Sequence, residues 1–158
     1  MRLTARVAAV ILLLDQISKY LVVQGLDLAN RGAIDVLPPW LNFRMAWNRG
    51  VNFGLFSGET DLTRWGLILV ALVIAGWVWR GIARPGHGRA AQASAGLLIG
   101  GALGNVIDRL TYGAVADFLN MSLPGWANPY SFNVADIAIF AGAGGLMLFA
   151  AEKPKTEA

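Results

Sequence analysis

The sequence predicts an α-helical polytopic membrane protein with four transmembrane helices, a small extracytoplasmic β-sheet cradle, and a short interfacial helix or loop. The first observation is composition: apolar types make up 56% of the 158 residues and charged types only 15%, whereas about a quarter of a soluble domain is charged. The second is four apolar windows near the roughly 20 residues that span a bilayer. The third is an aromatic segment with glycine breaks between the first two windows.

The predicted helices cover residues 3–23, 62–79, 90–109 and 134–151, within one membrane-embedded domain over 1–158. The third window repeats a small residue at every fourth position, at Gly96, Gly100 and Gly104. This spacing lets membrane helices approach closely. The first window begins like a signal peptide, but "DQISK" follows directly and no small-x-small cleavage site closes it, so we expect a retained helix.

Basic residues predict the orientation of the four helices. Short segments at both termini and between the second and third windows hold Arg2, Arg6, Arg80, Arg84, Arg89, Lys153 and Lys155. Cytoplasmic segments carry the excess of Lys and Arg. Both termini are therefore predicted to be cytoplasmic, and residues 24–61 and 110–133 are predicted to face outward.

The two outward segments differ in pattern. The stretch "VLPPWLNFRMAWNRGVNFGLF" predicts two to four short strands, within a cradle at about 34–58. Its aromatic residues suit the lipid interface: Trp40, Phe43, Trp47, Phe53 and Phe56. The second segment contains "MSLPGWANPY", which predicts a loop or short interfacial helix within 119–131.

Composition excludes several kinds of site. The chain has no cysteine and one histidine, so disulfides, thiolate chemistry and Cys-based zinc sites are excluded. A His-based metal cluster or a Ser-His-Asp triad is not expected from His87 alone. We therefore expect no metal and no cofactor, and the small net charge of +3 gives no indication of a nucleic-acid partner.

Ionisable and amide residues gather at the outer ends of the predicted helices. They are Asp15 and Lys19 in the first helix, Asn105, Asp108 and Arg109 at the end of the third, Asp117 just beyond it, and Asn133 and Asp136 at the start of the fourth. Helix packing alone does not require four parts of the chain to aim polar groups at one membrane face, so this convergence is the main functional signal.

Structural interpretations stay open for most of these residues. Asp15 and Lys19 lie four apart and form a neutralising pair on one helix face. Asp108 and Arg109 bind different neighbours and fix a helix end. Asp136 occupies the third position after an Asn133 N-cap, where the helix dipole favours a carboxylate. Asp117, in "GAVADF", has no such explanation in its neighbouring sequence.

Two carboxylates at a polar–apolar boundary share a proton, because like charges a few ångströms apart do not both ionise easily. One then draws a proton from a water that attacks a carbonyl, and the other hydrogen-bonds the carbonyl oxygen. The helix dipole favours Asp136 as the base, and apolar neighbours favour Asp117 as the acid.

Five motifs, in order along the chain, resemble those of the bacterial lipoprotein signal peptidases, also called signal peptidase II. They are "DQISK" at 15–19, "NRGVNFG" at 48–54, "GGALGNVIDR" at 100–109, "GAVADF" at 113–118 and "FNVAD" at 132–136. The resemblance implies an aspartic endopeptidase of the bacterial inner membrane that cuts prolipoproteins before a diacylglyceryl-modified cysteine. One departure is Asn52, where the family usually has a small residue.

The same resemblance implies roles for the matching residues. Asp117 and Asp136 are the implied catalytic pair. The supporting or substrate-binding residues are Asp15, Lys19, Asn48, Gly50, Asn105, Asp108, Arg109 and Asn133. It also implies that the sheet is a cradle on the membrane surface, that the second outer segment is a lid, and that the cyclic peptide globomycin inhibits the enzyme. The expected partners are prolipoprotein substrate, membrane lipid and a globomycin-type inhibitor, and we expect a monomer.

Two other functions compete with this interpretation. A small proton or ion carrier would also use intramembrane carboxylates, but its polar groups should line the full depth of the membrane. A scaffold subunit held by glycine-rich helix faces would explain the packing but not the aspartates. Cleavage of a modified prolipoprotein by the purified protein separates all three.

Overall fold

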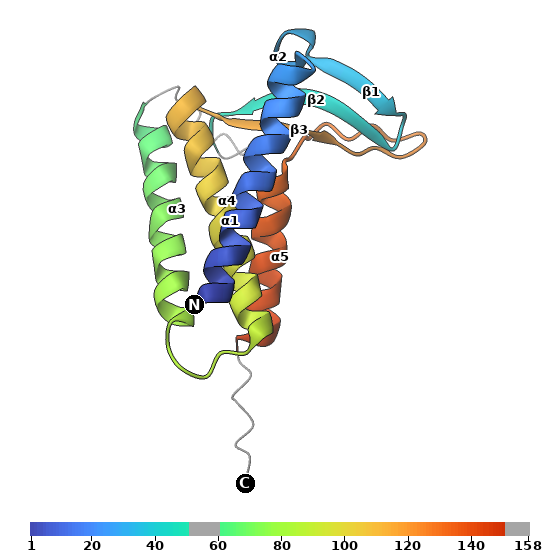
Figure 1. The fold of residues 1–158 in the computed structure, drawn as a ribbon. Helices are drawn as coiled ribbons and strands as arrows, with labels where there is room; N and C mark the ends of the chain where they lie inside the picture. The colour runs from blue at the N-terminus through green and yellow to red at the C-terminus, as the bar shows by residue number, and fades with distance from the viewer. Residues whose placement is uncertain (51–60, 151–158) are drawn as a thin grey trace.

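A computed structural model describes residues 1–50 and 61–150 of the chain. The elements are, in order, α1 (Arg2–Lys19), the π-helical turns η1 (Tyr20–Gly25), α2 (Leu28–Arg31), β1 (Ala33–Leu37), β2 (Leu41–Asn48), α3 (Asp61–Ile82), α4 (Arg89–Tyr112), β3 (Val115–Asn120) and α5 (Val134–Phe149). The four long helices form a bundle, and the sheet lies across one end of it (Figure 1).

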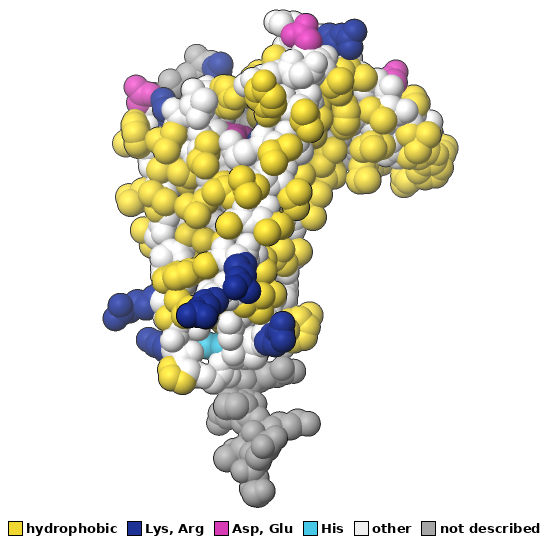
Figure 2. All heavy atoms as spheres, viewed as in Figure 1, with side chains coloured by type: hydrophobic (Ala, Val, Ile, Leu, Met, Phe, Trp, Pro, Cys, Tyr) yellow, Lys and Arg dark blue, Asp and Glu magenta, His cyan; other side chains and the backbone are white. Residues whose placement is uncertain are grey.

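Helix α4 is the centre of the bundle and packs against α1, α3 and α5. In its most apolar window 61% of the residues are buried, compared with 17% in the α1–η1 window and 22% in α3. The outer helices therefore turn much of their apolar surface outward, and hydrophobic side chains cover the sides of the bundle (Figure 2). Such a surface is suited to lipid rather than to water.

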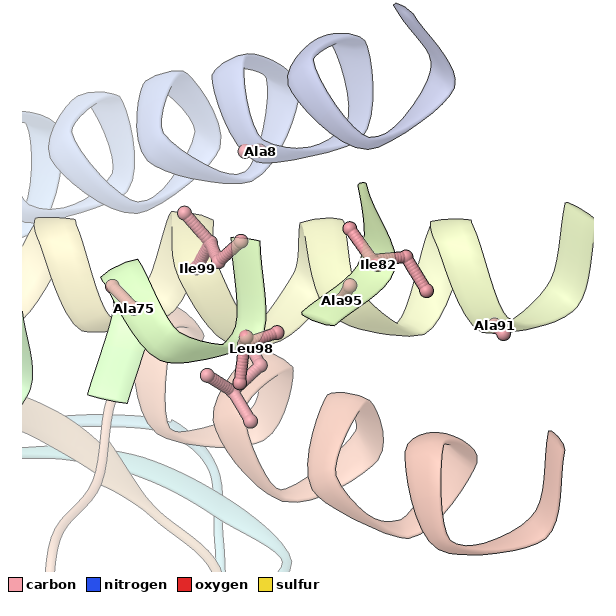
Figure 3. Packing of buried hydrophobic residues seen from close by; sticks show 8 residues of the cluster. Ala8, Ala75, Ile82, Ala91, Ala95, Leu98 and Ile99 are labelled. Atoms are coloured by element: carbon pink, nitrogen blue, oxygen red, sulfur yellow. The ribbon is translucent and has the colours of Figure 1, made fainter. Parts of the chain in front are cut away.

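Small residues set the close contact between α4 and α1, as their four-residue spacing predicted. A Cβ added at Gly100 would lie 2.6 Å from the backbone oxygen of Ala8. Farther along α4, a Cβ at Gly104 would lie 2.5 Å from a carboxylate oxygen of Asp15. Lower in the bundle, Ala8, Ile82, Ala95 and Ile99 belong to the apolar core that joins α1, α3 and α4 (Figure 3).

Within the part of the chain that the structure describes, three helical segments are long and apolar enough to cross a bilayer: Arg2–Gly25, Asp61–Ile82 and Arg89–Tyr112. Helix α5 is a shorter apolar helix, and the expected extension to residue 151 falls at the edge of the described part of the chain. The fold class predicted from the sequence is confirmed, and the protein is a multi-pass membrane protein.

The sheet differs from the one that the sequence predicted. Its strand order is β1-β2-β3, with both pairs antiparallel. The sequence placed all strands within 34–58, but β3 comes from the second outer segment and pairs with β2 across about 70 residues of chain. That pairing is non-local, so local periodicity does not reveal it. The sheet rests on η1 and α2 through a core that includes Val23, Leu28, Phe43 and Phe118.

The second outer segment continues from β3 as a loop, the simpler of the two predicted forms. Asn120 fixes it, because its amide donates to the backbone oxygens of Asn128 (2.8 Å) and Tyr130 (2.9 Å). The four-residue helix α2 was not predicted. Trp40 and Trp47 are half exposed on the sheet, as suits the lipid interface. Phe53, Phe56 and the unusual Asn52 lie outside the described residues.

Candidate active site

The outer ends of α1, α4 and α5 meet β3 and the end of β2 in one buried polar cluster. Nine of its side chains are joined by hydrogen bonds or ion pairs to at least one other member: Asp15, Gln16, Lys19, Asn48, Asn105, Asp108, Asp117, Asn133 and Asp136. The convergence predicted from the sequence is therefore present.

Asp117 lies in the middle of β3 and is only 4% exposed. Gly113 positions the strand, because its φ of 76° ends α4 in a left-handed turn that favours glycine and starts the chain toward the sheet. Both carboxylate oxygens accept hydrogen bonds from amides. Asn133 Nδ2 donates to Oδ1 at 2.6 Å, and Asn48 Nδ2 donates to Oδ2 at 3.2 Å.

Asp136 lies in the first turn of α5 and completes a capping box with Asn133. The Asn133 side chain accepts from the Asp136 N–H at 2.9 Å, and Asp136 Oδ2 accepts from the Asn133 N–H at 3.2 Å. Asp136 Oδ1 accepts from Asn105 Nδ2 at 3.0 Å. The predicted capping role of Asp136 is confirmed, and it coexists with a place beside the second carboxylate.

Asn133 connects the two carboxylates, since one amide donates to Asp117 and accepts from the backbone of Asp136. The two aspartates also interact electrostatically. Burial, followed by the negative charge of Asp136, raises the pKa of Asp117 to about 6, although the amide hydrogen bonds of Asn48 and Asn133 lower it. A carboxyl group with such a pKa holds or releases a proton near neutral pH.

Lys19 joins two further buried carboxylates. Its Nζ lies 2.7 Å from Asp15 Oδ2 and 2.7 Å from Asp108 Oδ2. Asp15 is thus not simply part of a neutralising pair with Lys19, because the lysine serves two aspartates.

Each of these carboxylates also holds the backbone next to one candidate catalytic residue. Asp15 Oδ1 accepts from the N–H of Ala135, which precedes Asp136, at 2.9 Å. Asp108 Oδ2 accepts from the N–H of Ala116, which precedes Asp117, at 3.0 Å. We call Asp15, Lys19 and Asp108 the lysine bracket. It links the backbone N–H groups of the residues that precede the two candidate catalytic aspartates. Its two carboxylates and one ammonium group would be costly to bury without one another.

Arg109 and Asp108 bind different neighbours, as predicted. The Arg109 guanidinium donates to the backbone oxygen of Asn105 at 3.3 Å, and it lies within electrostatic range of Asp117 and Asp136. Asn105 Oδ1 faces Lys19 Nζ at 3.5 Å. Gly50 follows β2 and adjoins residues 51–60, which the structure does not describe, so its predicted role stays a prediction.

Gln16 is the polar residue of this cluster that the sequence analysis did not include among the site residues. Its amide donates to Asp15 Oδ2 (3.1 Å) and Asp108 Oδ1 (3.0 Å), so it supports the lysine bracket from the side. The signal was present: Gln16 is a polar residue in an apolar helix, next to Asp15.

A groove of about 700 Å³ opens on the sheet beside the cluster. It runs between β2 and the loop after β3, and its lining includes Asn42, Arg44, Ala46, Trp126 and Ser131. Ala46 is the β-sheet partner of Asp117. The groove therefore reaches the strand position opposite the carboxylate but does not itself contain either aspartate.

Comparison with known proteins gives one consistent result. The family model described as signal peptidase (SPase) II matches residues 7–151. A lipoprotein signal peptidase of Methylobacterium sp. (strain 4-46) is 44% identical over 141 residues, which are 89% of this chain and 84% of the relative. One of Rhodopseudomonas palustris (strain ATCC BAA-98 / CGA009) is 39% identical over 92% of this chain and 90% of its own.

Solved structures show the same fold. A bacterial membrane enzyme determined by the in meso method at 2.3 Å has a TM-score of 0.74 and 26% identity, covering 98% of this chain and 93% of its own. A second, at 1.9 Å, has a TM-score of 0.76 and 25% identity over 92% and 90%. From the family match and the close relatives, the chain belongs to the signal peptidase II family of peptidases.

Proposed function

We propose that the protein is an aspartic endopeptidase that removes signal peptides from diacylglyceryl-modified prolipoproteins, cleaving before the lipid-modified cysteine. Family membership supports the reaction. One structural observation supports its assignment to this site: buried Asp117 on β3 and half-buried Asp136 in the first turn of α5 lie in the same polar cluster and are connected by Asn133. Shared-proton chemistry depends on such a pair.

In the proposed reaction Asp136 is the base. Its carboxylate lies in the first turn of α5 and is held by two hydrogen bonds, one from the Asn105 amide and one from the Asn133 N–H. Asp136 takes a proton from water as the water oxygen bonds to the scissile carbonyl carbon. Asp117 donates its proton to the carbonyl oxygen. The resulting diol collapses as a proton passes to the leaving nitrogen, the C–N bond breaks, and a carboxylic acid and an amine are formed.

Asn48 is suited to the change in protonation that this scheme requires. Its buried Oδ1 has no hydrogen-bond partner among residues 1–50 and 61–150, while its Nδ2 donates to Asp117 Oδ2. If the amide turns over, Oδ1 accepts a hydrogen bond from protonated Asp117. Asn133 lacks this freedom, because its Oδ1 already accepts from the Asp136 N–H. Asn48 thus accommodates both forms of Asp117.

The proposed surroundings follow from the same placement. Chain 1–158 acts as one membrane-embedded domain and as a monomer, with lipid around α1, α3 and α5 and substrate contacts from Asn48 and the sheet. The loop within 119–131 covers the site, and a globomycin-type cyclic peptide inhibits it. The enzyme lies in the bacterial inner membrane with both termini cytoplasmic, because the described end of the bundle opposite the aspartates shows Lys and Arg side chains without Asp or Glu (Figure 2).

A proton or ion carrier is not favoured. The buried ionisable side chains of the described residues are Asp15, Lys19, Asp108 and Asp117. All four belong to the cluster at the sheet end. The core around the rest of α4 is apolar, and none of these four side chains lies in it. A carrier needs polar groups across the whole membrane depth.

The direct test uses the purified protein and a synthetic prolipoprotein peptide whose cysteine carries diacylglyceryl. We expect one cut before that cysteine, detected by mass spectrometry. The same peptide without the lipid is the matched control and should be cut far more slowly. Absence of cleavage by a folded protein would refute the proposed activity. Equal cleavage of both peptides would refute the proposed requirement for the lipid.

A further inference from the structure

A second groove lies at the other end of the bundle, far from the aspartates along α3 and α5. Its volume is about 420 Å³. Its apolar lining comes from the last turns of α3 and from the end of α5, and includes Trp77, Val78, Ile82, Leu146 and Met147. Two polar residues of the loop after α3, Arg84 and His87, complete the lining.

This groove faces the surroundings of the bundle rather than its core. Trp77 is 76% exposed and Met147 is 84% exposed. Both helices pack against α4 instead. Because α3 is a membrane-spanning helix, the medium that meets these side chains is the hydrocarbon of the bilayer near its edge. An alkyl chain is the occupant with matching chemistry.

The charged side chains around the groove are positive. Five arginines lie at this end, and none of their guanidinium groups has an ion-pair or hydrogen-bond partner among the described residues: Arg2, Arg6, Arg80, Arg84 and Arg89. The Asp and Glu side chains visible in Figure 2 lie at the opposite end. Unpaired cations at a membrane boundary attract anionic headgroups.

We propose that the groove between α3 and α5 binds an anionic phospholipid, with one acyl chain on its apolar lining and the headgroup phosphate on Arg84 and His87. The acyl chain alone gives little selectivity, since the same chain is equally apolar in bulk lipid. Preference for this site therefore depends on the phosphate and its charge. The proposal is independent of the peptidase activity.

The test is native mass spectrometry of the full chain, released from nanodiscs that contain equal amounts of phosphatidylglycerol and phosphatidylcholine. We expect retained phosphatidylglycerol to exceed phosphatidylcholine. Arg84→Gln should lower that excess about five-fold, the usual contribution of one cation near a membrane surface. The matched control is Arg80→Gln, which removes the same charge at the same end but outside the groove lining.

A second pair of variants tests the apolar part of the proposed lipid site, where the acyl chain would lie. Gly81 lines the groove, and a Cβ there meets no atom within 4 Å, so Gly81→Leu should fill the space without disturbing the fold and remove the retained lipid. Gly76→Leu is the control, because Gly76 is equally open on α3 but does not line the groove. Quenching of Trp fluorescence by brominated phosphatidylglycerol should fall only in the Gly81 variant.

Three outcomes would overturn the proposal. They are equal retention of both lipids, equal effects of Arg84→Gln and Arg80→Gln, and a dimer that Gly81→Leu abolishes, which would make a second copy of the chain the occupant. Cleavage of the synthetic prolipoprotein in detergent should be unchanged in all four variants. Failure of the lipid site is therefore distinguishable from failure of the proposed activity.

Discussion

Asp117 and Asp136 have the same side chain, but they differ in burial and in the element that carries them. Asp117 is buried within a strand, and Asp136 is half-buried at a helix N-terminus. Each accepts two hydrogen bonds, and Asn133 takes part in holding both. Two carboxyl groups in unlike environments separate into an acid and a base.

We expect Asp117→Asn and Asp136→Asn each to lower cleavage at least about 10²–10⁴-fold, the usual contribution of general acid–base catalysis. Each change keeps the shape of the side chain and removes its titration. Globomycin-type binding should stay close to that of the parent, and both variants should remain folded. Asp27→Asn, on the exposed residue before α2, is the matched control. A single Asn variant that cleaves at the parental rate would refute the two-aspartate mechanism.

The raised pKa of Asp117 predicts a pH dependence of stability. Below pH 3.8 the carboxyl is protonated in both the folded and the unfolded chain. Between 3.8 and about 6 the unfolded chain ionises while the folded chain keeps its proton, so the stabilisation present at low pH is lost as pH rises. The total is on the order of 3 kcal/mol.

Melting temperature in detergent measures this loss. The difference between the parent and Asp117→Asn should shrink or reverse from pH 4 to 6 and level off above pH 7, because the variant has no proton to release at this position. A difference that is constant over this range would show that the pKa of Asp117 is not raised.

The lysine bracket acts at the level of whole elements. Asp15 on α1 holds the first turn of α5, Asp108 on α4 holds the start of β3, and Lys19 binds both aspartates. Two elements that carry the candidate catalytic carboxyls are thus fixed to two helices through one ammonium group. Ala116 and Ala135 present only backbone N–H groups to it, so their sequence gives no sign of the contact.

We expect Asp108→Ala to lower the melting temperature and the yield as well as the cleavage rate. It leaves Lys19 with one buried partner and the Ala116 N–H with none, and loss of one member of a buried ion pair costs about 3–5 kcal/mol. Asp35→Ala, which breaks the more exposed pair with Arg44, is the control and should change stability little. A stable but inactive Asp108 variant would instead place Asp108 in the chemistry.

Close packing of α4 on α1 is a second property of elements. Gly100→Ala places a methyl group 2.6 Å from the Ala8 backbone oxygen, and we expect a loss of about 1–3 kcal/mol, measured as a lower melting temperature. Gly76→Ala on α3 is the control: its Cβ meets nothing within 4 Å, so a small gain from helix propensity is expected. Equal effects of the two changes would argue against close packing at Gly100.

At the scale of the whole molecule, the two ends of the bundle have opposite chemistry. The aspartates and the sheet occupy one end, where basic side chains are also present, whereas the other end shows basic side chains without acidic ones among the described residues (Figures 1 and 2). This asymmetry predicts one orientation in the membrane, because cytoplasmic segments collect Lys and Arg. The proposed lipid groove and the candidate active site lie at opposite ends of the bundle.

The absence of native cysteine makes the orientation simple to test. Single cysteines at Arg31, before the sheet, and at Ala83, after α3, both replace exposed residues. In intact spheroplasts, a thiol reagent that does not cross membranes should label Arg31→Cys only, and it should label both after lysis. Labelling of Ala83→Cys in intact cells would reverse the proposed topology.

The sequence by itself determined the membrane class, the helices and the identity of the polar residues, because each depends on residues that are near one another in the chain. Helical spans follow from length and hydropathy, close helix packing from the spacing of Gly96, Gly100 and Gly104, and the α5 cap from Asn133 followed by Asp136. The five motifs also named most of the site, although Gln16 was left out.

Only the tertiary structure decided how those residues meet. The pairing of β2 with β3, the contacts of Asp15 and Asp108 with backbone N–H groups, and the link through Asn133 join positions from 8 to 120 residues apart. Backbone groups are identical at every residue, so their partners leave no mark in composition or periodicity. The burial that raises the pKa of Asp117 likewise depends on neighbours from β2, α1 and α5, which only the folded chain brings together.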